Sequence, residues 1–353
     1  MLAVILVFSF SAEAVSAKSA ILMDAETGRV LYSKMPDEKS LIASTTKIMT
    51  ALVVCEQCNV LDRVRIPKEA VGIEGSSVYL QEGEILTVQE LLYGLMLHSG
   101  NDAAVTLAIY CGGTVENFVQ LMNDKVKALG LSNTHFENPH GLDGKDHYST
   151  ARDLAILASY AMVNPIFSKI VSTQSIKAGS RYFKNHNKLL WQLEGADGVK
   201  TGFTKSAGRI LVSSATRMDR RLVAVTINDP CDWKDHCALI NDGFTRFKES
   251  KIIIQNQIMG QVEIAGGQCT QVELLAKEDF SYYLAEDELV EIHLPPQGFV
   301  YAPVAEGQSA GYAQVYVNEH WIGKIPLLYG QTVEQEVQEN PSVWKKLLRG
   351  NHT

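Results

Sequence analysis

The spacing of apolar residues changes near Lys251, and this change divides the chain of 353 residues into two regions. Before it, apolar positions recur with helical spacing in several segments, which lie between apolar runs of strand length. After it, apolar residues alternate with polar ones at Val262–Ile264, Val272–Leu274, Val290–Leu294 and Val315–Val317. Alternation of this kind predicts strands with one buried face. We therefore expect an α+β domain over residues 18–249 and a small all-β domain over residues 251–333.

The first region has strand patterns at both ends and a block of helical patterns between them. Two apolar runs flank the turn-forming segment Asp24–Gly28, which predicts a β-hairpin over residues 20–33. Helical spacing predicts helices over residues 47–58, 87–97, 102–110, 115–129 and 237–247, with a further helix that begins at 149–153. Further strands are predicted at 209–215 and 221–227, and loops at 138–144 and 232–235. This order predicts a mainly antiparallel sheet with a helical cluster.

The first 17 residues resemble a secretion signal. Leu2–Phe10 is an apolar run too short to span a bilayer, and Ala12-Glu13-Ala14 and Val15-Ser16-Ala17 suit a signal peptidase. We expect residues 1–17 to be removed, so that the protein works outside the cytoplasm, in the cell wall or on the outer face of the cytoplasmic membrane. The basic stretch that usually precedes such a run is missing, so a buried first strand is the alternative.

The last residues, 339–353, combine apolar and basic side chains. On a helix, Val343, Trp344, Leu347 and Leu348 share one face, and lysine and arginine surround it. This pattern favours an amphipathic anchor on a membrane surface and is too short to span the membrane. A frayed, weakly amphipathic terminus is the alternative.

Composition excludes several classes of protein. Hydrophobic residues make up 46% of the chain and charged residues 20%, as in a folded globular protein. The net charge of −8 argues against a nucleic-acid partner. No zinc-type cysteine pattern and no His-Glu-x-x-His motif occurs, so we expect neither a metal nor another cofactor. Among the six cysteines, Cys231 and Cys237 flank a turn-like segment, but spacing alone establishes no disulfide.

Three short motifs carry side chains suited to acyl transfer. In Ser44-Thr45-Thr46-Lys47, a helix start places serine and lysine on one face, and a lysine kept neutral in a dry pocket can take the serine proton. Ser99-Gly100-Asn101 offers a hydroxyl that can pass a proton and an amide that can bind a peptide group and a lysine. Lys200-Thr201-Gly202 can bind a carboxylate beside a strand edge. Each motif alone is more often an ordinary helix start or turn, and only their combination predicts a site.

Together with longer runs around them, these motifs resemble the low-molecular-mass penicillin-binding proteins, serine-type D-Ala-D-Ala carboxypeptidases that include the DacF-type enzymes. The runs are Asp24–Gly28, Ser44–Thr50, Ser99–Ala104, Phe136–Leu142, Tyr148–Leu154 and Asp197–Thr204. The resemblance is dense over residues 20 to 248 and looser over the β-rich region and the tail. It implies a transpeptidase domain of the penicillin-binding and β-lactamase type, with an antiparallel sheet and a helical cluster.

The resemblance implies catalytic roles for Ser44, Lys47 and Ser99. Ser44 would attack the carbonyl of the penultimate D-alanine of a peptidoglycan stem peptide, forming an acyl-enzyme. Lys47 would take the proton of Ser44, and Ser99 would relay a proton to the leaving amine. β-Lactams would acylate the same serine as covalent inhibitors.

The resemblance also implies binding roles for Asn101 and for residues 200–203. Asn101 would hold Lys47 and the substrate amide, while Lys200 and Thr201 would bind the terminal carboxylate. Gly202 would let the substrate lie along the strand, and the backbone N–H groups of Ser44 and Phe203 would form the oxyanion hole. Some members of the family have histidine where this chain has Phe203. His98, beside Ser99, is more often a packed neighbour than a base.

Three rival functions share some of these motifs. A class A β-lactamase deacylates through a glutamate followed by Leu-Asn, a dipeptide that this chain lacks. An endopeptidase that cuts peptidoglycan crosslinks would carry the same motifs, as would a non-catalytic sensor whose acyl-enzyme persists. The endopeptidase would be recognised by activity on crosslinked dimers, and the sensor by slow release of penicillin without peptide turnover.

Overall fold

The computed structural model describes residues 15–296 and 298–336. It separates into two compact units, Met1–Phe244 and Thr245–Thr353. The expected anchor at 339–353 and residues 1–14 of the expected leader lie outside the described residues. Within the described residues, no single helix has both the length and the apolarity to span a bilayer, although the helices Ala151–Val163 and Pro165–Ser172, bent at 105°, reach both as a pair.

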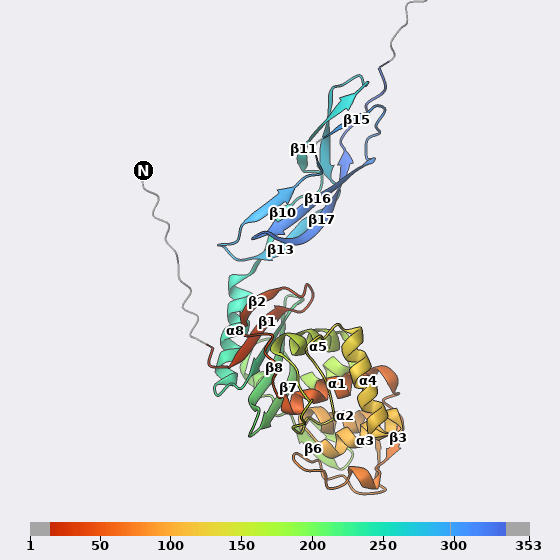
Figure 1. Cartoon of the computed structure of the whole chain (residues 1–353), viewed down its shortest axis with the longest axis vertical. Helices are drawn as coiled ribbons and strands as arrows, with labels where there is room; N and C mark the ends of the chain where they lie inside the picture. Colours follow the sequence, from red (N-terminus) through yellow and green to blue (C-terminus); the bar gives the residue numbers. More distant parts are fainter. Residues whose placement is uncertain (1–14, 297, 337–353) are drawn as a thin grey trace, which may run out of the picture. The chain divides into compact units, whose positions relative to one another are not determined.

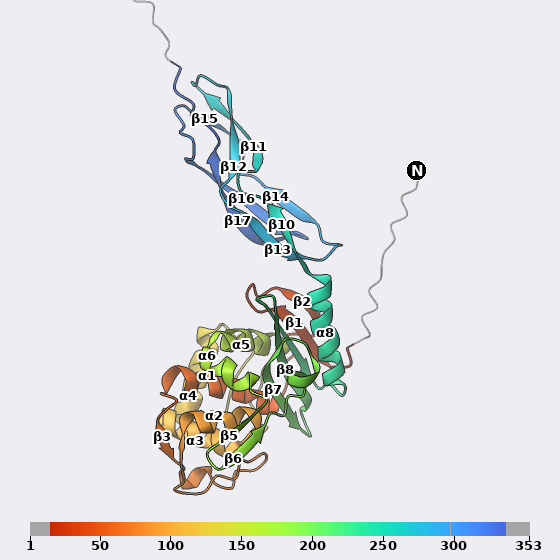
Figure 2. The same cartoon turned by 180° about the vertical axis from the view of Figure 1, so that it is seen from behind.

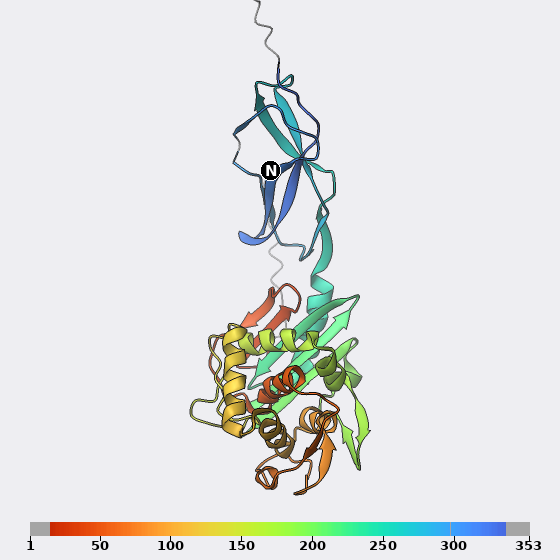
Figure 3. The same cartoon turned by 90° about the vertical axis from the view of Figure 1, so that its right-hand side faces the viewer.

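The first unit is built on an antiparallel sheet with the strand order β2-β1-β9-β8-β7 (Figures 1 and 3). Its strands are β1 (Ser19–Asp24), β2 (Val30–Lys34), β7 (Ala196–Thr204), β8 (Gly208–Arg217) and β9 (Arg220–Ile227). Two small hairpins are β3 (Arg63–Arg65) with β4 (Ile85–Thr87), and β5 (Ser175–Ala178) with β6 (Arg181–Lys184). The α-helices are α1 (Lys47–Gln57), α2 (Val88–Leu97), α3 (Asn101–Gly112), α4 (Val115–Ala128), α5 (Ala151–Val163), α6 (Pro165–Ser172), α7 (Leu189–Gln192) and α8 (Asp232–Arg246). The 3₁₀ turns are η1 (Ala43–Thr46) and η2 (Lys68–Ala70).

Both faces of this sheet are buried at its inner strands β1 and β9, which explains why these strands read as nearly continuous apolar runs. Successive side chains of a strand point to opposite faces. In β1, Ile21 and Met23 therefore pack in the core shared with helices α1 to α6, while Ala20 and Leu22 pack against α8. Figures 1 and 2 show α8 on one side of the sheet and the helical cluster on the other. The helical cluster and the antiparallel sheet confirm the predicted α+β class.

Most predicted elements of this unit are confirmed, and one is wrong. The hairpin over residues 20–33 is formed by β1 and β2, and capping by Thr87, Thr114 and Thr150 starts α2, α4 and α5 near the predicted residues. The predicted loop at 232–235 is instead the first turn of α8. Aspartates are favourable in a first helical turn because the helix dipole is positive there, so Asp232 and Asp235 start a helix rather than interrupt it.

Residues 15–17, which the sequence assigns to the leader, are packed into this unit. Val15 is 4% exposed and Ala17 is 1% exposed. The backbone N–H of Ser16 donates to Asp235 Oδ2 at 2.6 Å, and its hydroxyl donates to Asp229 Oδ1 at 2.6 Å. These three residues therefore contribute to the folded unit.

The second unit is all-β, as predicted. One sheet has the order β14-β16-β17-β12-β11-β15, in which β11 and β15 pair in parallel, and β10 pairs with β13. The strands are β10 (Lys248–Ile253), β11 (Ile258–Ala265), β12 (Gln271–Ala276), β13 (Phe280–Leu284), β14 (Val290–His293), β15 (Phe299–Tyr301), β16 (Ser309–Val317) and β17 (His320–Tyr329). Alternate residues such as Val272, Leu274 and Ala276 are buried. The predicted period-two segments therefore each lie in a strand, except that β14 ends at His293, one residue before Leu294.

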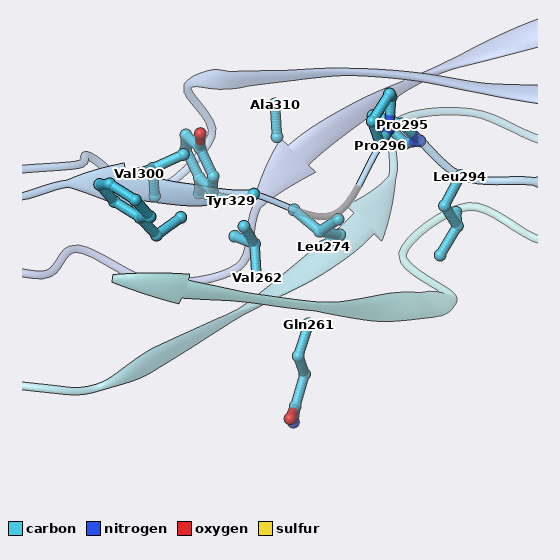
Figure 4. Close-up of a pocket in the computed structure, with 11 residues that line it drawn as sticks. Gln261, Val262, Leu274, Leu294, Pro295, Pro296, Val300, Ala310 and Tyr329 are labelled. Carbon is cyan, nitrogen blue, oxygen red and sulfur yellow. The ribbon is translucent and has the colours of Figure 1, made fainter. Parts of the chain in front are cut away.

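A small pocket in the second unit is mainly apolar (Figure 4). Its lining includes Val262, Leu274, Leu294, Val300 and Ala310, whose aliphatic side chains offer no nucleophile, acid or base. None of the residues that the sequence selects as site residues lies there. The chemistry must therefore be sought in the first unit.

Candidate active site

Ser44 and Lys47 lie at the junction of η1 and α1. The turn is closed by Thr45, whose N–H and hydroxyl both donate to the Ile42 carbonyl, at 3.1 and 2.5 Å. The spacing of three residues brings the two functional side chains together, and Lys47 Nζ lies 3.0 Å from Ser44 Oγ. Ser44 is half-buried, so its hydroxyl faces both the lysine and solvent.

Lys47 is enclosed by oxygen acceptors that carry no formal charge. Its side chain is fully buried, and besides Ser44 it donates to Asn101 Oδ1 at 2.7 Å and to the His140 carbonyl at 2.6 Å. Burial holds the pKa of Lys47 well below its usual range, and the nearby Lys200 ammonium lowers it further. The nearby Asp102 carboxylate raises this pKa in part. A neutral amine with a lone pair directed at a hydroxyl is a general base.

Asn101 is the first residue of α3, and the segment 74–76 fixes its amide. The Asn101 side-chain NH₂ donates to the Glu74 carbonyl at 2.5 Å, and its backbone N–H donates to the Ser76 carbonyl at 2.7 Å. Gly75 has φ +93°, and a Cβ there would lie 2.7 Å from Asn101 Nδ2. A side chain at position 75 would therefore displace the amide that holds Lys47.

Ser99 lies on the turn between α2 and α3, two residues before Asn101. It adopts φ +64°, which is rare for a residue with a side chain, and it is 6% exposed. Unusual backbone conformations persist where the surrounding fold imposes them and are often found at functional sites. Ser99 therefore lies just before the start of α3, where Asn101 contacts Lys47.

Lys200, Thr201 and Gly202 lie in β7, the last strand in the sheet order, and not in a turn. A Cβ on Gly202 would lie 3.3 Å from the Ser44 backbone nitrogen and 3.3 Å from the Ile42 carbonyl. The absence of a side chain at Gly202 therefore lets β7 pass directly beside the serine. Among the described residues, no strand pairs with the other edge of β7, so its backbone groups on that edge can bind an extended peptide.

Lys200 is the second buried cation of the site. It is 2% exposed, and its ammonium donates to the Thr201 carbonyl at 2.9 Å. Burial lowers the pKa of Lys200 to about 7. Phe203, three residues after Lys200, has a side chain that is 64% exposed.

A loop at residues 138–143 completes the surroundings of Lys47, and sequence reasoning on chemistry gave it no role. The His140 carbonyl accepts from Lys47, and the Pro139 carbonyl accepts from Thr50 at 2.6 Å. A Cβ on Gly141, which has φ +91°, would lie 1.9 Å from the Ala43 carbonyl. In the sequence, the glycine at position 141 was the one signal that the loop approaches another backbone segment closely.

Asp102 is a second residue whose role the sequence did not reveal. Its buried carboxylate accepts from the Ser77 hydroxyl at 2.7 Å and from the backbone N–H groups of Val78 and Leu80 at 3.1 Å. It thereby ties the segment 77–80 to the start of α3, next to Asn101. Several donors to one buried carboxylate make a rigid support for the neighbouring amide.

His98, adjacent to Ser99, contacts a different group. Its Nδ1 lies 3.2 Å from His186 Nε2, and its ring packs edge-on against Phe183. Burial lowers the pKa of His98, and Lys200 lowers it further. These contacts agree with the interpretation of His98 as a packed neighbour.

Comparisons with known proteins match both units of the chain. The family model described as D-alanyl-D-alanine carboxypeptidase matches residues 7–231, and the model of the penicillin-binding protein 5 C-terminal domain matches residues 247–335. The chain is 34% identical to D-alanyl-D-alanine carboxypeptidase DacF of Bacillus subtilis, over 84% of this chain and 80% of that protein. It is also 34% identical to DacC of Escherichia coli, over 92% of this chain and 86% of that protein.

Solved structures resemble the fold over both units. Penicillin-binding protein 5 of Haemophilus influenzae matches with a TM-score of 0.71 and 30% identity, over 91% of this chain and 98% of that one. The family assignment does not depend on the site geometry. It rests on a family match over most of the first unit and on relatives with more than 30% identity along most of the chain. The chain therefore belongs to the D-alanyl-D-alanine carboxypeptidase family of low-molecular-mass penicillin-binding proteins, and it is a serine-type peptidase.

Proposed function

We propose that Ser44 is the nucleophile of this carboxypeptidase and that Lys47 is its general base. The single observation that carries the proposal is the contact of 3.0 Å between Lys47 Nζ and Ser44 Oγ, with the lysine fully buried. Lys47 takes the Ser44 proton as the oxygen attacks the carbonyl of the penultimate D-alanine. The product is an acyl-enzyme, which is also the state in which a β-lactam would trap the protein.

The substrate binds along the free edge of β7. Lys200 and Thr201 bind its terminal carboxylate, and that negative charge favours the protonated form of Lys200, which keeps Lys47 neutral. Support comes from Gly202, whose lack of a side chain leaves room beside the Ser44 nitrogen. The N–H groups of Ser44 and Phe203 then stabilise the oxyanion, a contribution on the order of 3 kcal/mol for each donor.

Collapse of the tetrahedral intermediate breaks the bond to the terminal D-alanine. Ser99 passes a proton to the leaving amine, and Asn101 holds both Lys47 and the substrate amide. Water then attacks the acyl-enzyme with Lys47 as the base and frees the shortened peptide. Removal of the terminal residue leaves a stem peptide that cannot serve as a crosslinking donor, so the activity limits peptidoglycan crosslinking.

The proposed place of action is outside the cytoplasm, at the cell wall. The packing of Val15, Ser16 and Ala17 argues that a leader is cut after Ala14 and not after Ala17. Burial raises the pKa of Asp229, and removal of Ser16 would leave this carboxylate beside Asp235 without the hydroxyl that bridges them. N-terminal sequencing of the exported protein should begin at Val15, and a sequence beginning at Lys18 would refute this site.

The tail proposal, an interfacial anchor at 339–353, requires its own test. Full-length protein and a variant that ends at residue 340 are mixed with vesicles of an anionic and a neutral lipid and sedimented. We expect only the full-length protein to sediment with the vesicles. Equal sedimentation of the two proteins would refute the anchor.

The nucleophile is tested by the mass of the intact protein after treatment with benzylpenicillin. The wild-type protein should gain one penicilloyl group, and Ser44→Ala should gain none. Release of D-alanine from a pentapeptide should fall by about 10³-fold or more in the same variant. Ser44→Ala removes only one half-buried oxygen, so we expect the variant to fold. Circular dichroism checks this expectation.

Three outcomes would overturn parts of the proposal. Acylation of Ser44→Ala would show that another residue is the nucleophile. Acylation of the wild-type protein without turnover of the pentapeptide would favour the sensor. Faster cleavage of crosslinked dimers than of pentapeptides would favour the endopeptidase.

A further inference from the structure

Helices α1 and α3 are joined at the site by their first residues. Lys47 begins α1, Asn101 begins α3, and the two side chains are hydrogen-bonded at 2.7 Å. The two helices pack against one another and contribute Leu52 and Leu107, among others, to the same core. A bond at the opposite ends of this pair would fix how Lys47 and Asn101 face each other.

The opposite ends of the two helices each carry a cysteine. Cys58 is the C-cap residue of α1, and Cys111 lies in the last turn of α3. Their thiols are in hydrogen-bonding contact, so both ends of α1 and α3 meet and the helices run parallel. Cys58 and Cys111 are half-buried at the edge of the core, where a small oxidant can reach them.

We propose that Cys58 and Cys111 form a disulfide that links the C-terminal ends of α1 and α3. Two contacting thiols at the ends of packed helices meet the first requirement for such a bond, which is that the sulfur atoms lie near one another. Sequence spacing did not suggest this pair, because the two residues are about 50 positions apart and become neighbours only through helix packing.

The chemistry is thiol–disulfide exchange with a small disulfide as oxidant, such as oxidised glutathione. The Cys58 thiolate attacks one sulfur of the oxidant, a mixed disulfide forms, and one thiol leaves with a proton. The Cys111 sulfur, after losing its proton, then attacks Cys58 and releases the second thiol. Two protein thiols are oxidised and one disulfide is reduced. The hydrogen bond from Cys111 lowers the pKa of Cys58, which favours Cys58 as the first attacker.

The link should stabilise the fold more than it changes the reaction. At 1.5 Å per residue, the ends of α1 and α3 lie about 16 Å from Lys47. A crosslink between Cys58 and Cys111 closes a loop of about 50 residues, and it stabilises the fold chiefly by restricting the unfolded chain. For a domain of this size, we expect the oxidised protein to melt about 10 °C above the reduced one.

The test uses the full chain, reduced and then exposed to oxidised glutathione. Free thiols are blocked with iodoacetamide, and the digested protein is analysed by mass spectrometry without reduction. We expect one dominant crosslinked peptide that contains Cys58 and Cys111, with a loss of two hydrogens. Crosslinks that join Cys58 to Cys55, or a fully reduced pair after prolonged oxidation, would overturn the proposal.

Matched variants separate the link from the effect of substitution itself. In Cys58→Ser and in Cys111→Ser, the difference in melting temperature between oxidised and reduced samples should vanish. In Cys231→Ser, which changes an exposed cysteine, the difference should remain. Loss of the difference in Cys231→Ser, or its persistence in Cys58→Ser, would overturn the proposal. Acylation of Ser44 by benzylpenicillin in the same samples reports on the proposed function separately, because it does not require the disulfide.

Discussion

The two units of the chain differ in what they bury. The described part of the second unit buries apolar side chains such as Val272, Val315 and Leu327, and its charged groups lie at the surface. The first unit buries aspartates, histidines and two lysines as well as an apolar core. Removing a charged group from water costs free energy, so it persists only where the fold compensates it or the chemistry needs it.

Within the first unit, the buried charges are of two kinds. Asp24 and Arg220 form an ion pair at 2.9 Å, and both side chains are about equally buried. Among the described residues, no carboxylate lies within ion-pair distance of Lys47 or Lys200. A paired charge is structural, whereas an unpaired buried cation with a lowered pKa marks a site where a neutral amine or an incoming anion is required.

The largest effect should come from Lys47→Ala. We expect kcat/KM for a D-Ala-D-Ala peptide to fall by about 10³-fold because the general base is lost, while the fold is retained. The matched variant is Arg220→Ala, which leaves Asp24 buried and unpaired. That variant should lose about 3 kcal/mol of unfolding free energy with little change in the kcat/KM of the folded protein. The distinction between the two kinds of buried charge would fail if Arg220→Ala abolished activity or if Lys47→Ala unfolded the protein.

The next effect concerns pH. Lys200 must be protonated to bind the substrate carboxylate, and its pKa of about 7 lies below the usual 10.5. We therefore expect kcat/KM to fall about tenfold per pH unit above that pKa, since kcat/KM reports the free enzyme. Lys47 must be neutral, and burial holds its pKa well below the usual range. Activity should therefore also fall toward acidic pH, where Lys47 becomes protonated.

A matched substrate tests the assignment of the alkaline limb. A peptide whose terminal carboxylate is amidated gains nothing from a charged Lys200, so its alkaline limb should be weaker or absent. An alkaline limb that is the same for both peptides would mean that another group titrates. A limb near 10.5 would mean that Lys200 keeps the pKa of an exposed lysine.

A smaller effect is expected from Asp102→Asn. Asparagine keeps one acceptor but directs an NH₂ group at backbone donors of Val78 or Leu80, so one buried bond is lost. We expect about 2 kcal/mol less unfolding free energy and a kcat/KM about tenfold lower, because Asn101 loses its support. Asp124→Asn, on the exposed surface of α4, should change neither quantity. Equal loss in both variants would contradict the positioning role of Asp102.

The sequence allowed the α+β class, the all-β second unit and the helical starts to be predicted because local signals specify them. The cap at Thr87 and the period-two segment at Val272 are recognisable from adjacent residues alone. The motifs at Ser44, Ser99 and Lys200 could be selected for the same reason, as short combinations of residue types with shared chemistry.

The rest depended on packing that no local pattern encodes. Lys47 donates to the backbone carbonyl of His140. Every residue has such a carbonyl, so the residue type at position 140 gave no sign of this contact. Asp102 resembles an ordinary first-turn acid until the fold brings Ser77 and Val78 to it. The aspartates of the loop expected at 232–235 suit a helix N-terminus as well as a turn, and the segment is helical. Local propensity was ambiguous there, and the contact of α8 with the sheet decided it.

The smallest effect should come from removing the second unit, and it tests the comparison as a whole. The described residues 245–336 bury no cation and contain none of the proposed site residues. If charge burial marks where the chemistry occurs, a chain that ends at Phe247 should fold and hydrolyse a soluble D-Ala-D-Ala peptide with kcat/KM within about twofold of the full chain. Benzylpenicillin acylation at Ser44 should be equally retained. A folded truncation that still acylates but no longer turns over peptide would show that the second unit contributes to deacylation, and the division between a chemical unit and an apolar, structural one would be wrong.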